Sequence, residues 1–196
     1  SNGTIFNGAI GASQRLGSLT TGAGGSTAMN GGSVTANSQI YNDPVILRTD
    51  MILTAPTSGN IAFGSTVNGA KALTVRNAGL TTFSGLVGGT TALASLTTDA
   101  TGTTAINTAA ITTSGAQSYQ DGVTLGGVGT AVAFTSSANA DIMFGSTLSG
   151  GKHLTVNTAG LTVFAGVVSG LASLTTDPAG SAAINATAIS TTGTQT

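Results

Sequence analysis

The chain has 196 residues, of which 6% are charged and 40% are hydrophobic, and its formal net charge is −1. A globular domain usually has about a quarter of its residues charged, so an ordinary domain surface is excluded. The small net charge also excludes a basic surface that could follow phosphates, and no apolar run reaches the ~18–20 residues of a membrane span. We therefore expect neither a nucleic-acid partner nor a membrane span.

A long repeat organises the chain. The stretch Asn60–Gly79 (NIAFGSTVNGAKALTVRNAG) returns without a gap as Asp141–Gly160 (DIMFGSTLSGGKHLTVNTAG). A second, slightly shorter interval is marked by three evenly spaced glutamines, Gln39, Gln117 and Gln195. We interpret the chain as one continuous domain over residues 1–196, with repeat copies at approximately 1–81 (partial at its start), 82–162 and 163–196 (partial at its end).

A shorter period lies inside each copy. Alternating strands such as Ile61-Ala62-Phe63 and Leu73-Thr74-Val75 are followed by turns such as Asn77-Ala78-Gly79. The pattern predicts an all-β fold, a right-handed parallel β-helix (β-solenoid) of about ten coils of roughly 20 residues, with four coils in each 78-residue repeat. One large apolar residue from each coil is expected to form an inward ladder: Phe6, Met29, Leu47, Phe63, Phe83, Ile106, Leu125, Phe144, Phe164 and Ile184.

A sandwich or barrel is the alternative fold. It would need hairpins, which Asn-Gly and Asp-Gly dipeptides usually mark. Those dipeptides occur only in scattered segments, whereas the large apolar residues recur in every segment. The regular recurrence therefore favours a solenoid.

His153 is the only histidine, and it takes the place of Ala72 in the other copy. A Ser–His–Asp arrangement would have to combine it with Asp141 and one of many serines. We interpret His153 as a solvent-facing variant of the repeat. The sequence predicts no catalytic, cofactor-binding or metal-binding residue, so we expect no enzyme and no cofactor.

The aspartates mostly recur between copies, Asp43 as Asp121 and Asp99 as Asp177. Paired catalytic carboxylates must lie close together, whereas repeat equivalents are whole coils apart. We interpret these residues as turn aspartates that cap their own backbone, with weak calcium binding at the turns as an alternative. Two equivalent tyrosines precede such turns, and we expect them to pack at corners, with sugar stacking as the alternative: Tyr41 and Tyr119.

The phrases LTVNTAG, LASLTTD, TTGTQT and YNDPV resemble the β-strand repeats of very large secreted bacterial surface proteins. They are similar to filamentous-haemagglutinin-type adhesins and autotransporter passengers, and the resemblance covers the whole chain. It implies a β-helical adhesin, biofilm-matrix component or fibre protein, located outside the cell or on the bacterial surface. The partners expected are copies of the chain itself or adjoining repeats of the same long chain, and host or matrix glycans.

We therefore expect a structural or adhesive rod that associates end to end. Neither end shows a polar capping coil, so we expect the ends to be continued by the same chain or closed by other copies. Two rival functions need features that the repeat does not supply. An ice-binding solenoid needs a regular Thr-x-Thr row, and a carbohydrate-active β-helix enzyme needs acid and base residues that break the repeat.

Overall fold

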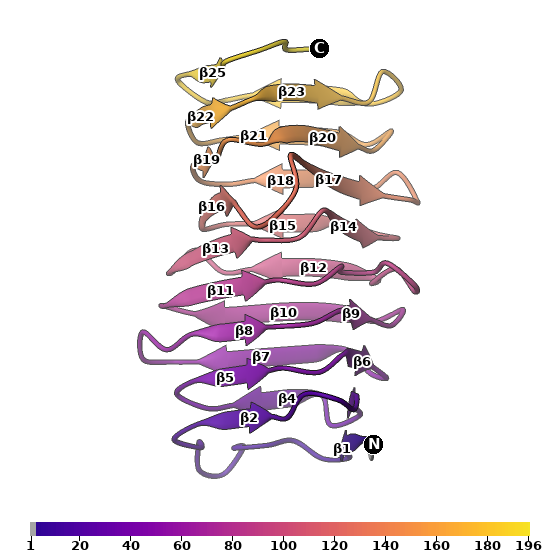
Figure 1. Cartoon of the computed structure of the whole chain (residues 1–196), viewed down its shortest axis with the longest axis vertical. Helices are drawn as coiled ribbons and strands as arrows, with labels where there is room; N and C mark the ends of the chain where they lie inside the picture. Colours follow the sequence, from indigo (N-terminus) through magenta and orange to yellow (C-terminus); the bar gives the residue numbers. More distant parts are fainter. Residues whose placement is uncertain (1–2) are drawn as a thin grey trace.

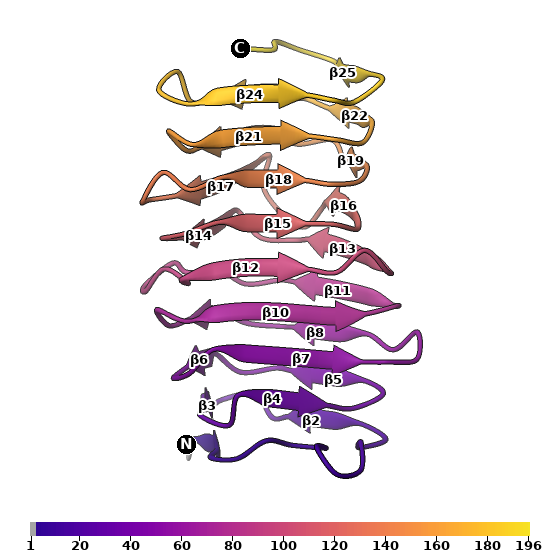
Figure 2. The ribbon, with the colours of Figure 1, turned by 180° about the vertical axis from the view of Figure 1, so that it is seen from behind.

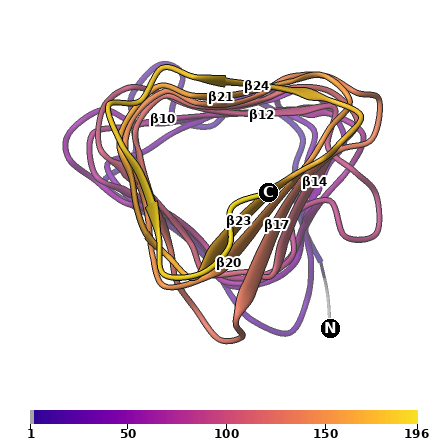
Figure 3. The ribbon, with the colours of Figure 1, turned by 90° about the horizontal axis from the view of Figure 1, so that it is seen from above.

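A computed structural model describes residues 3–196 and shows a β-solenoid of 25 short strands, without a helix in this range. The strands pair in parallel and form about nine coils, each about 22 residues long. Seen down its axis the solenoid is triangular, so each coil crosses three faces (Figure 3). The predicted parallel β-helix is confirmed, with nine coils of 22 residues in place of ten of 20.

Face 1 consists of two four-stranded sheets, joined by isolated bridges from Val67 to Val87 and from Val87 to Ile111. Its strands, seen at the right front of Figure 1, are β1 (Thr4–Phe6), β3 (Thr27–Met29), β6 (Val45–Leu47), β9 (Val67–Asn68), β14 (Ala110–Thr113), β17 (Ala131–Ser136), β20 (His153–Asn157) and β23 (Ser173–Thr176).

Face 2 is one continuous eight-stranded sheet, which is at the front of Figure 2. Its strands are β4 (Ser33–Thr35), β7 (Met51–Ala55), β10 (Ala72–Asn77), β12 (Ser95–Thr98), β15 (Gln117–Tyr119), β18 (Ile142–Phe144), β21 (Leu161–Phe164) and β24 (Ser181–Ile184).

Face 3 is a nine-stranded sheet at the left front of Figure 1. Its strands are β2 (Leu19–Thr21), β5 (Gln39–Tyr41), β8 (Ile61–Phe63), β11 (Leu80–Phe83), β13 (Thr103–Ile106), β16 (Gly122–Leu125), β19 (Leu148–Ser149), β22 (Val168–Leu171) and β25 (Ile189–Thr191).

The coil is right-handed. In Figure 1 the chain runs from left to right along faces 3 and 1, returns from right to left along face 2 behind them, and climbs from the N-terminus to the C-terminus. Each inner strand forms hydrogen bonds with the strand one coil below and the strand one coil above. The backbone donors and acceptors of the inner strands are thus satisfied by the coils on either side.

The core lies inside the triangle and follows from the period-two alternation of the strands. In β8, Ile61 and Phe63 are fully buried whereas Ala62 between them is partly exposed. The same alternation in the other strands builds one hydrophobic cluster that runs from Met29 to Leu174. A single coil is too thin to have a core of its own, so its large apolar side chains are buried against the neighbouring coils. Each such burial stabilises the fold by about 1.5–3 kcal/mol.

The predicted ladder is divided over the three faces. Its first three members stack on face 1, its middle four on face 3 and its last three on face 2: Phe6, Met29 and Leu47; Phe63, Phe83, Ile106 and Leu125; Phe144, Phe164 and Ile184. The single ladder is therefore wrong at two steps, from Leu47 to Phe63 and from Leu125 to Phe144. Each of these steps advances two strands, which is two-thirds of a coil.

The sequence repeat and the coil do not have the same length. Ile61–Phe63 forms β8 on face 3, whereas its repeat equivalent, Ile142–Phe144, forms β18 on face 2. From β8 to β18 the chain advances by ten numbered strands and the bridge residue Val87, which makes eleven strand positions. One repeat is thus three and two-thirds coils, where the sequence predicted four. Each copy consequently presents its residues one face away from the previous copy.

Two corner loops explain why the offset between copies is not constant along the chain. Three additional residues lie in the corner between β16 and β17, so the offset is larger at Val132 than at Leu125. The corner that follows Val168 is three residues shorter than the corner that follows Val87, which restores the smaller offset. Insertions are confined to corners because the strands must stay in register with both neighbours.

Glycine is required where a corner approaches the coil below. Gly69 and its equivalent Gly150 have φ angles of 126° and 127°. A Cβ atom at these positions would lie 2.3 Å from the carbonyl oxygen of Leu47 and 2.2 Å from that of Leu125. Both the backbone angle and the close approach exclude a side chain.

Candidate functional site

The most conspicuous polar groups of the solenoid lie inside it. Each of the first two copies places Gln, Tyr and Asp at alternate positions, so that all three side chains are buried: Gln39, Tyr41 and Asp43 (the first polar rung), and Gln117, Tyr119 and Asp121 (the second polar rung). The spacing i, i+2, i+4 directs them to the same side of the strand. Within residues 3–196, every buried side-chain nitrogen and oxygen has a hydrogen-bond partner.

The tyrosine and the glutamine of a rung are joined directly. The Tyr41 hydroxyl donates to Gln39 Oε1 at 2.7 Å, and the Tyr119 hydroxyl donates to Gln117 Oε1 at 3.0 Å. Each amide nitrogen then donates to a backbone carbonyl, that of Thr54 at 3.0 Å and that of Thr135 at 2.9 Å. The rung thus links one face of the triangle to the next.

The aspartate of each rung ties the corner to threonines of other strands. Thr21 and Thr27 donate their hydroxyls to Asp43 Oδ1 at 2.7 and 2.8 Å. In the second rung, Thr98 donates to Asp121 Oδ1 at 2.7 Å and Thr104 to Asp121 Oδ2 at 2.8 Å. The expected capping of their own backbone is thus not their main role, because burial inside the corner directs their carboxylates to threonines of neighbouring strands; Asp121 also accepts a hydrogen bond from its own backbone.

The other recurring pair of aspartates, Asp99 and Asp177, has different hydrogen-bond partners. Asp177 Oδ1 accepts a hydrogen bond from the backbone N–H of Ala179 at 2.7 Å, which is the predicted turn cap. Asp99 instead accepts from the N–H of Asn77 in the coil below at 3.2 Å, and from the Thr101 hydroxyl in its own turn at 3.0 Å. Repeat-equivalent aspartates therefore need not have the same partners.

Three groups of the polar rungs have shifted pKa values: Tyr41, Tyr119 and Asp121. Burial raises the pKa of Asp121, and the hydrogen bonds from Thr98 and Thr104 oppose this rise. Burial also raises the pKa of Tyr41, and burial together with the charge of Asp121 raises the pKa of Tyr119. The tyrosines consequently stay protonated as donors to their glutamines.

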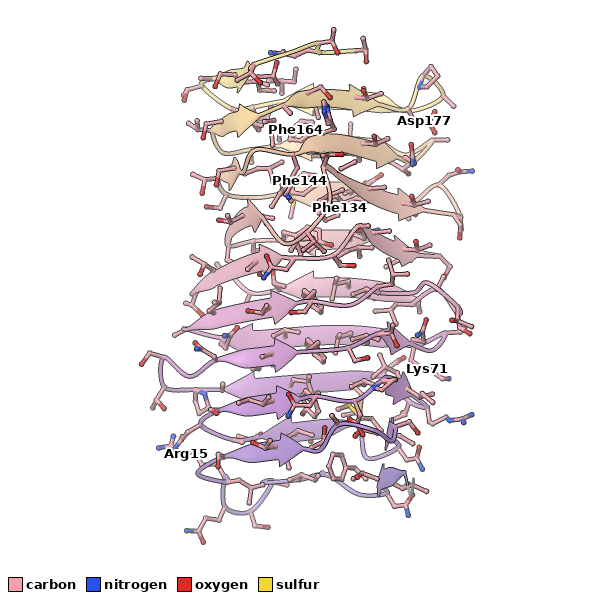
Figure 4. All side chains as sticks on the ribbon, in the orientation of Figure 1. Arg15, Lys71, Phe134, Phe144, Phe164 and Asp177 are labelled. Atoms are coloured by element: carbon pink, nitrogen blue, oxygen red, sulfur yellow. The ribbon has the colours of Figure 1, made fainter. Side chains whose placement is uncertain are left out.

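Aromatic rings stack above each tyrosine. The first aromatic column is Tyr41, Phe63 and Phe83, with ring centroids 5.3 and 5.0 Å apart, and the second is Tyr119, Phe144 and Phe164, with spacings of 5.5 and 5.4 Å. Figure 4 shows Phe134, Phe144 and Phe164 inside the coil. Tyr41 and Tyr119 are fully buried, so they belong to the core instead of an exposed corner where sugars could stack.

His153 lies on the outside of face 1, as the sequence predicted, and its Nδ1 is 2.8 Å from Ser173 Oγ on the next coil. Asp141 does not complete a triad with this pair, because His153 pairs with Ala131 at the start of β17 whereas Asp141 lies beyond the other end of that strand, where its Oδ1 accepts a hydrogen bond from the Leu161 N–H at 2.9 Å. Among residues 3–196, no group of three His, Cys, Asp or Glu side chains is placed to hold a metal ion.

Face 2 presents a regular column of outward side chains. The central outward column of face 2 follows the register of the sheet and mixes small, polar and apolar side chains: Ser33, Ile52, Thr74, Thr97, Ser118, Met143, Val163 and Ala183. Threonine occurs at only two successive places in this column. The column therefore lacks the regular array on which ice binding would depend.

A surface groove lies outside the corner where face 1 turns into face 2. Its volume is about 580 Å³, and its lining includes Ile46, Arg48, Asn68, Lys71 and Thr90. A second groove, of about 230 Å³, has Arg76 and Asp99 in its lining, so its charges are mixed. The residues of the larger groove come from successive coils, and Arg48 and Lys71 are about one coil length apart in the sequence, a signal that the sequence analysis did not use.

Sequence reasoning also missed the polar rungs. Their signal was present, since Gln, Tyr and Asp recur at identical spacing in two copies, but polar residues in a strand are ordinarily assigned to the exposed face.

Comparison with known proteins gives no match to a family model, a curated protein or a solved structure. In the described range, no helix has the length and apolar character to cross a membrane.

Proposed function

We propose that the chain is a structural and adhesive rod segment of an extracellular bacterial surface protein or fibre. The observation that carries the proposal is the uninterrupted interior. One hydrophobic cluster runs through the stacked coils, and the two polar rungs and two aromatic columns add contacts between the coils in which they lie. The resemblance of the repeats to those of secreted adhesins supports the location and the class.

The mechanical role follows from the way in which the coils hold each other. At a strand spacing of ~4.8 Å, nine coils give a rod of about 43 Å. No coil can leave the inside of the rod without breaking hydrogen bonds on both sides and exposing large side chains such as Phe63. Longer arrays of the same repeat extend the rod without any new kind of contact, because the contacts are between nearest neighbours.

Association with further copies is the second part of the proposal. The outer faces carry few charges to repel another rod, since only 6% of the residues are charged. Light scattering over a concentration series tests this part. Growth of the particle mass with concentration supports association, whereas a monomer that stays dispersed at the highest concentration contradicts it.

The rod itself is tested by pulling single molecules from their two ends. We expect stepwise extension, with about 22 residues released at each step, which corresponds to ~75 Å of chain. Electron microscopy of the native material is the companion experiment and should show filaments or cell-anchored stalks. A single unfolding event at low force, together with compact isolated particles, contradicts a load-bearing role.

A further inference from the structure

We infer that the groove at the corner between faces 1 and 2 is a binding site for acidic saccharides, formed around Arg48 and Lys71. These are two of the five basic residues of the chain. The site gives a ligand class to the adhesive part of the proposed function and rests on that proposal for its biological role, although a rod can be stiff and long without binding a small ligand. Binding and mechanical strength are also measured separately.

The two basic residues meet because of the coil register. β6 pairs with β9 through Ile46 and Asn68, and Gly69 lies against the backbone of Leu47, so the corners that carry Arg48 and Lys71 are stacked and both residues line the groove. The closest acidic residue in the sequence, Asp50, uses its Oδ1 to accept a hydrogen bond from the Ala72 N–H at 2.9 Å. No acidic side chain is part of the groove lining, so the lining is net positive.

In the second copy, the ammonium group of the equivalent lysine is bound by backbone oxygens of its own corner, so no comparable open site is left. Lys152, the equivalent of Lys71, donates to the carbonyl oxygens of Gly127 and Gly129 at 2.8 and 2.6 Å. Those two glycines belong to the corner that is three residues longer in this copy, and Gly126 takes the place of Arg48. The second copy thus supplies backbone oxygens to its lysine, whereas the first copy leaves Lys71 on an open groove beside an arginine.

A corner loop builds the wall of the groove. Asn68 Oδ1 accepts hydrogen bonds from the N–H groups of Thr90 and Thr91 at 2.9 and 3.2 Å, which fixes the loop against β9. Both threonines line the groove, so their hydroxyls are available to a ligand. The side chains of Pro44 and Ile46 add apolar surface to the same lining. An apolar floor with a few polar groups is the usual composition of a small-ligand site, and 580 Å³ is within the usual range of volumes.

The ligand class follows from this combination. A guanidinium binds carboxylate or sulfate with two parallel hydrogen bonds, and a lysine adds a point charge. The C–H faces of a sugar ring suit the apolar floor, and its hydroxyls suit Thr90 and Thr91. Nucleic acid fits less well, because it needs a continuous basic track and the chain has a net charge of −1.

Isothermal titration of the intact chain with defined oligosaccharides tests the site. One arm uses oligogalacturonate and sialyllactose, which carry carboxylates, and a second uses a heparin oligosaccharide, which carries sulfates. Maltohexaose and a single-stranded oligonucleotide complete the panel. We expect at least one acidic oligosaccharide to bind, more weakly at high salt, and the two arms identify the anionic group.

The variants Arg48→Gln and Lys71→Gln should each weaken this binding by at least about tenfold, since each removes a charge-assisted hydrogen bond. The matched control is Arg15→Gln, which removes an exposed basic side chain on the opposite side of the view in Figure 4 and should leave binding unchanged. Both groove residues are exposed, so the thermal midpoint should not change in any of these variants.

Deletion of Gly89–Thr91 gives a second test, because it shortens the corner to the length found after Val168 and removes the wall without removing a charge. We expect weaker binding and an intact fold. The proposal is overturned if no acidic saccharide binds, if maltohexaose or the oligonucleotide binds as tightly, or if binding survives both charge substitutions.

Discussion

The two aromatic columns have the same composition along the axis but differ at one side contact. In the second column, the ring of Phe134 meets Tyr119 and Phe144 edge-on, with centroid distances of 5.4 and 5.1 Å. In the first copy the equivalent position holds Leu53, which is also fully buried. The first column lies on face 3 and the second on face 2. Stacking from coil to coil is therefore what both copies share, whereas the contact across the triangle varies between them.

The largest effect is expected from removing the middle ring of a column. Phe144→Ala removes stacking on Tyr119 and Phe164 and the edge contact with Phe134, and should lower the free energy of unfolding by about 3–5 kcal/mol. Phe63→Ala, its counterpart without that edge contact, should cost about 0.5–1.5 kcal/mol less. Urea denaturation followed by far-ultraviolet circular dichroism measures both. Equal costs would show that the edge contact adds nothing.

The polar rungs allow the next comparison. Asp121→Ala leaves the buried hydroxyls of Thr98 and Thr104 without their acceptor, and should cost about 1–3 kcal/mol for the lost partner. Asp43→Ala should have a similar cost, because it too loses two threonine hydrogen bonds of similar length. Asp121→Asn keeps one acceptor oxygen and is the control. If Asn is as damaging as Ala in urea denaturation, the threonine hydrogen bonds are not the cause.

The side contact itself is tested by Phe134→Leu, which copies Leu53 into the second copy. We expect a loss of about 0.5–1.5 kcal/mol, the usual value of an edge-to-face aromatic pair. The same substitution combined with Phe144→Ala should cost less than it does alone, since one of its two ring partners is already absent. If Phe134→Leu costs the same free energy of unfolding with and without Phe144→Ala, its effect does not come from the contact with Phe144.

The smallest effect concerns pH. Burial raises the pKa of Asp121 above its ordinary 3.8, so the folded state binds this proton more tightly than the unfolded state. Stability from this group should therefore rise as the pH falls from neutrality through the raised pKa, and level off below 3.8. Asp121→Asn should lack this gain, so the stability difference in favour of the natural chain should grow as the pH falls. If the urea midpoints of the natural chain and of Asp121→Asn differ by the same amount at every pH, this expectation is contradicted.

Most of the fold was predictable because its cause is local. Alternation such as Ile61-Ala62-Phe63 sends every second side chain inward, and recurrence of the pattern over three copies requires stacked parallel strands. The site was less predictable. Arg48 and Lys71 are distant in the sequence and meet only because one coil separates them, and Lys152 gave no sign in the sequence that its own corner loop would bind it.

By itself the sequence determined that the chain is a stack of parallel β-strands with an apolar interior, because period-two alternation and repetition suffice for that. The tertiary structure alone decided which residue lies above which. A coil closes only when three strands and three corners have been added, and its length varies, since the coil from Met29 to Leu47 is shorter than the coil from Val87 to Ile111. The strands and corners of each repeat therefore add up to three and two-thirds coils, which turns every copy onto a new face, whereas the closure of a single coil brings Arg48 and Lys71 to the same groove.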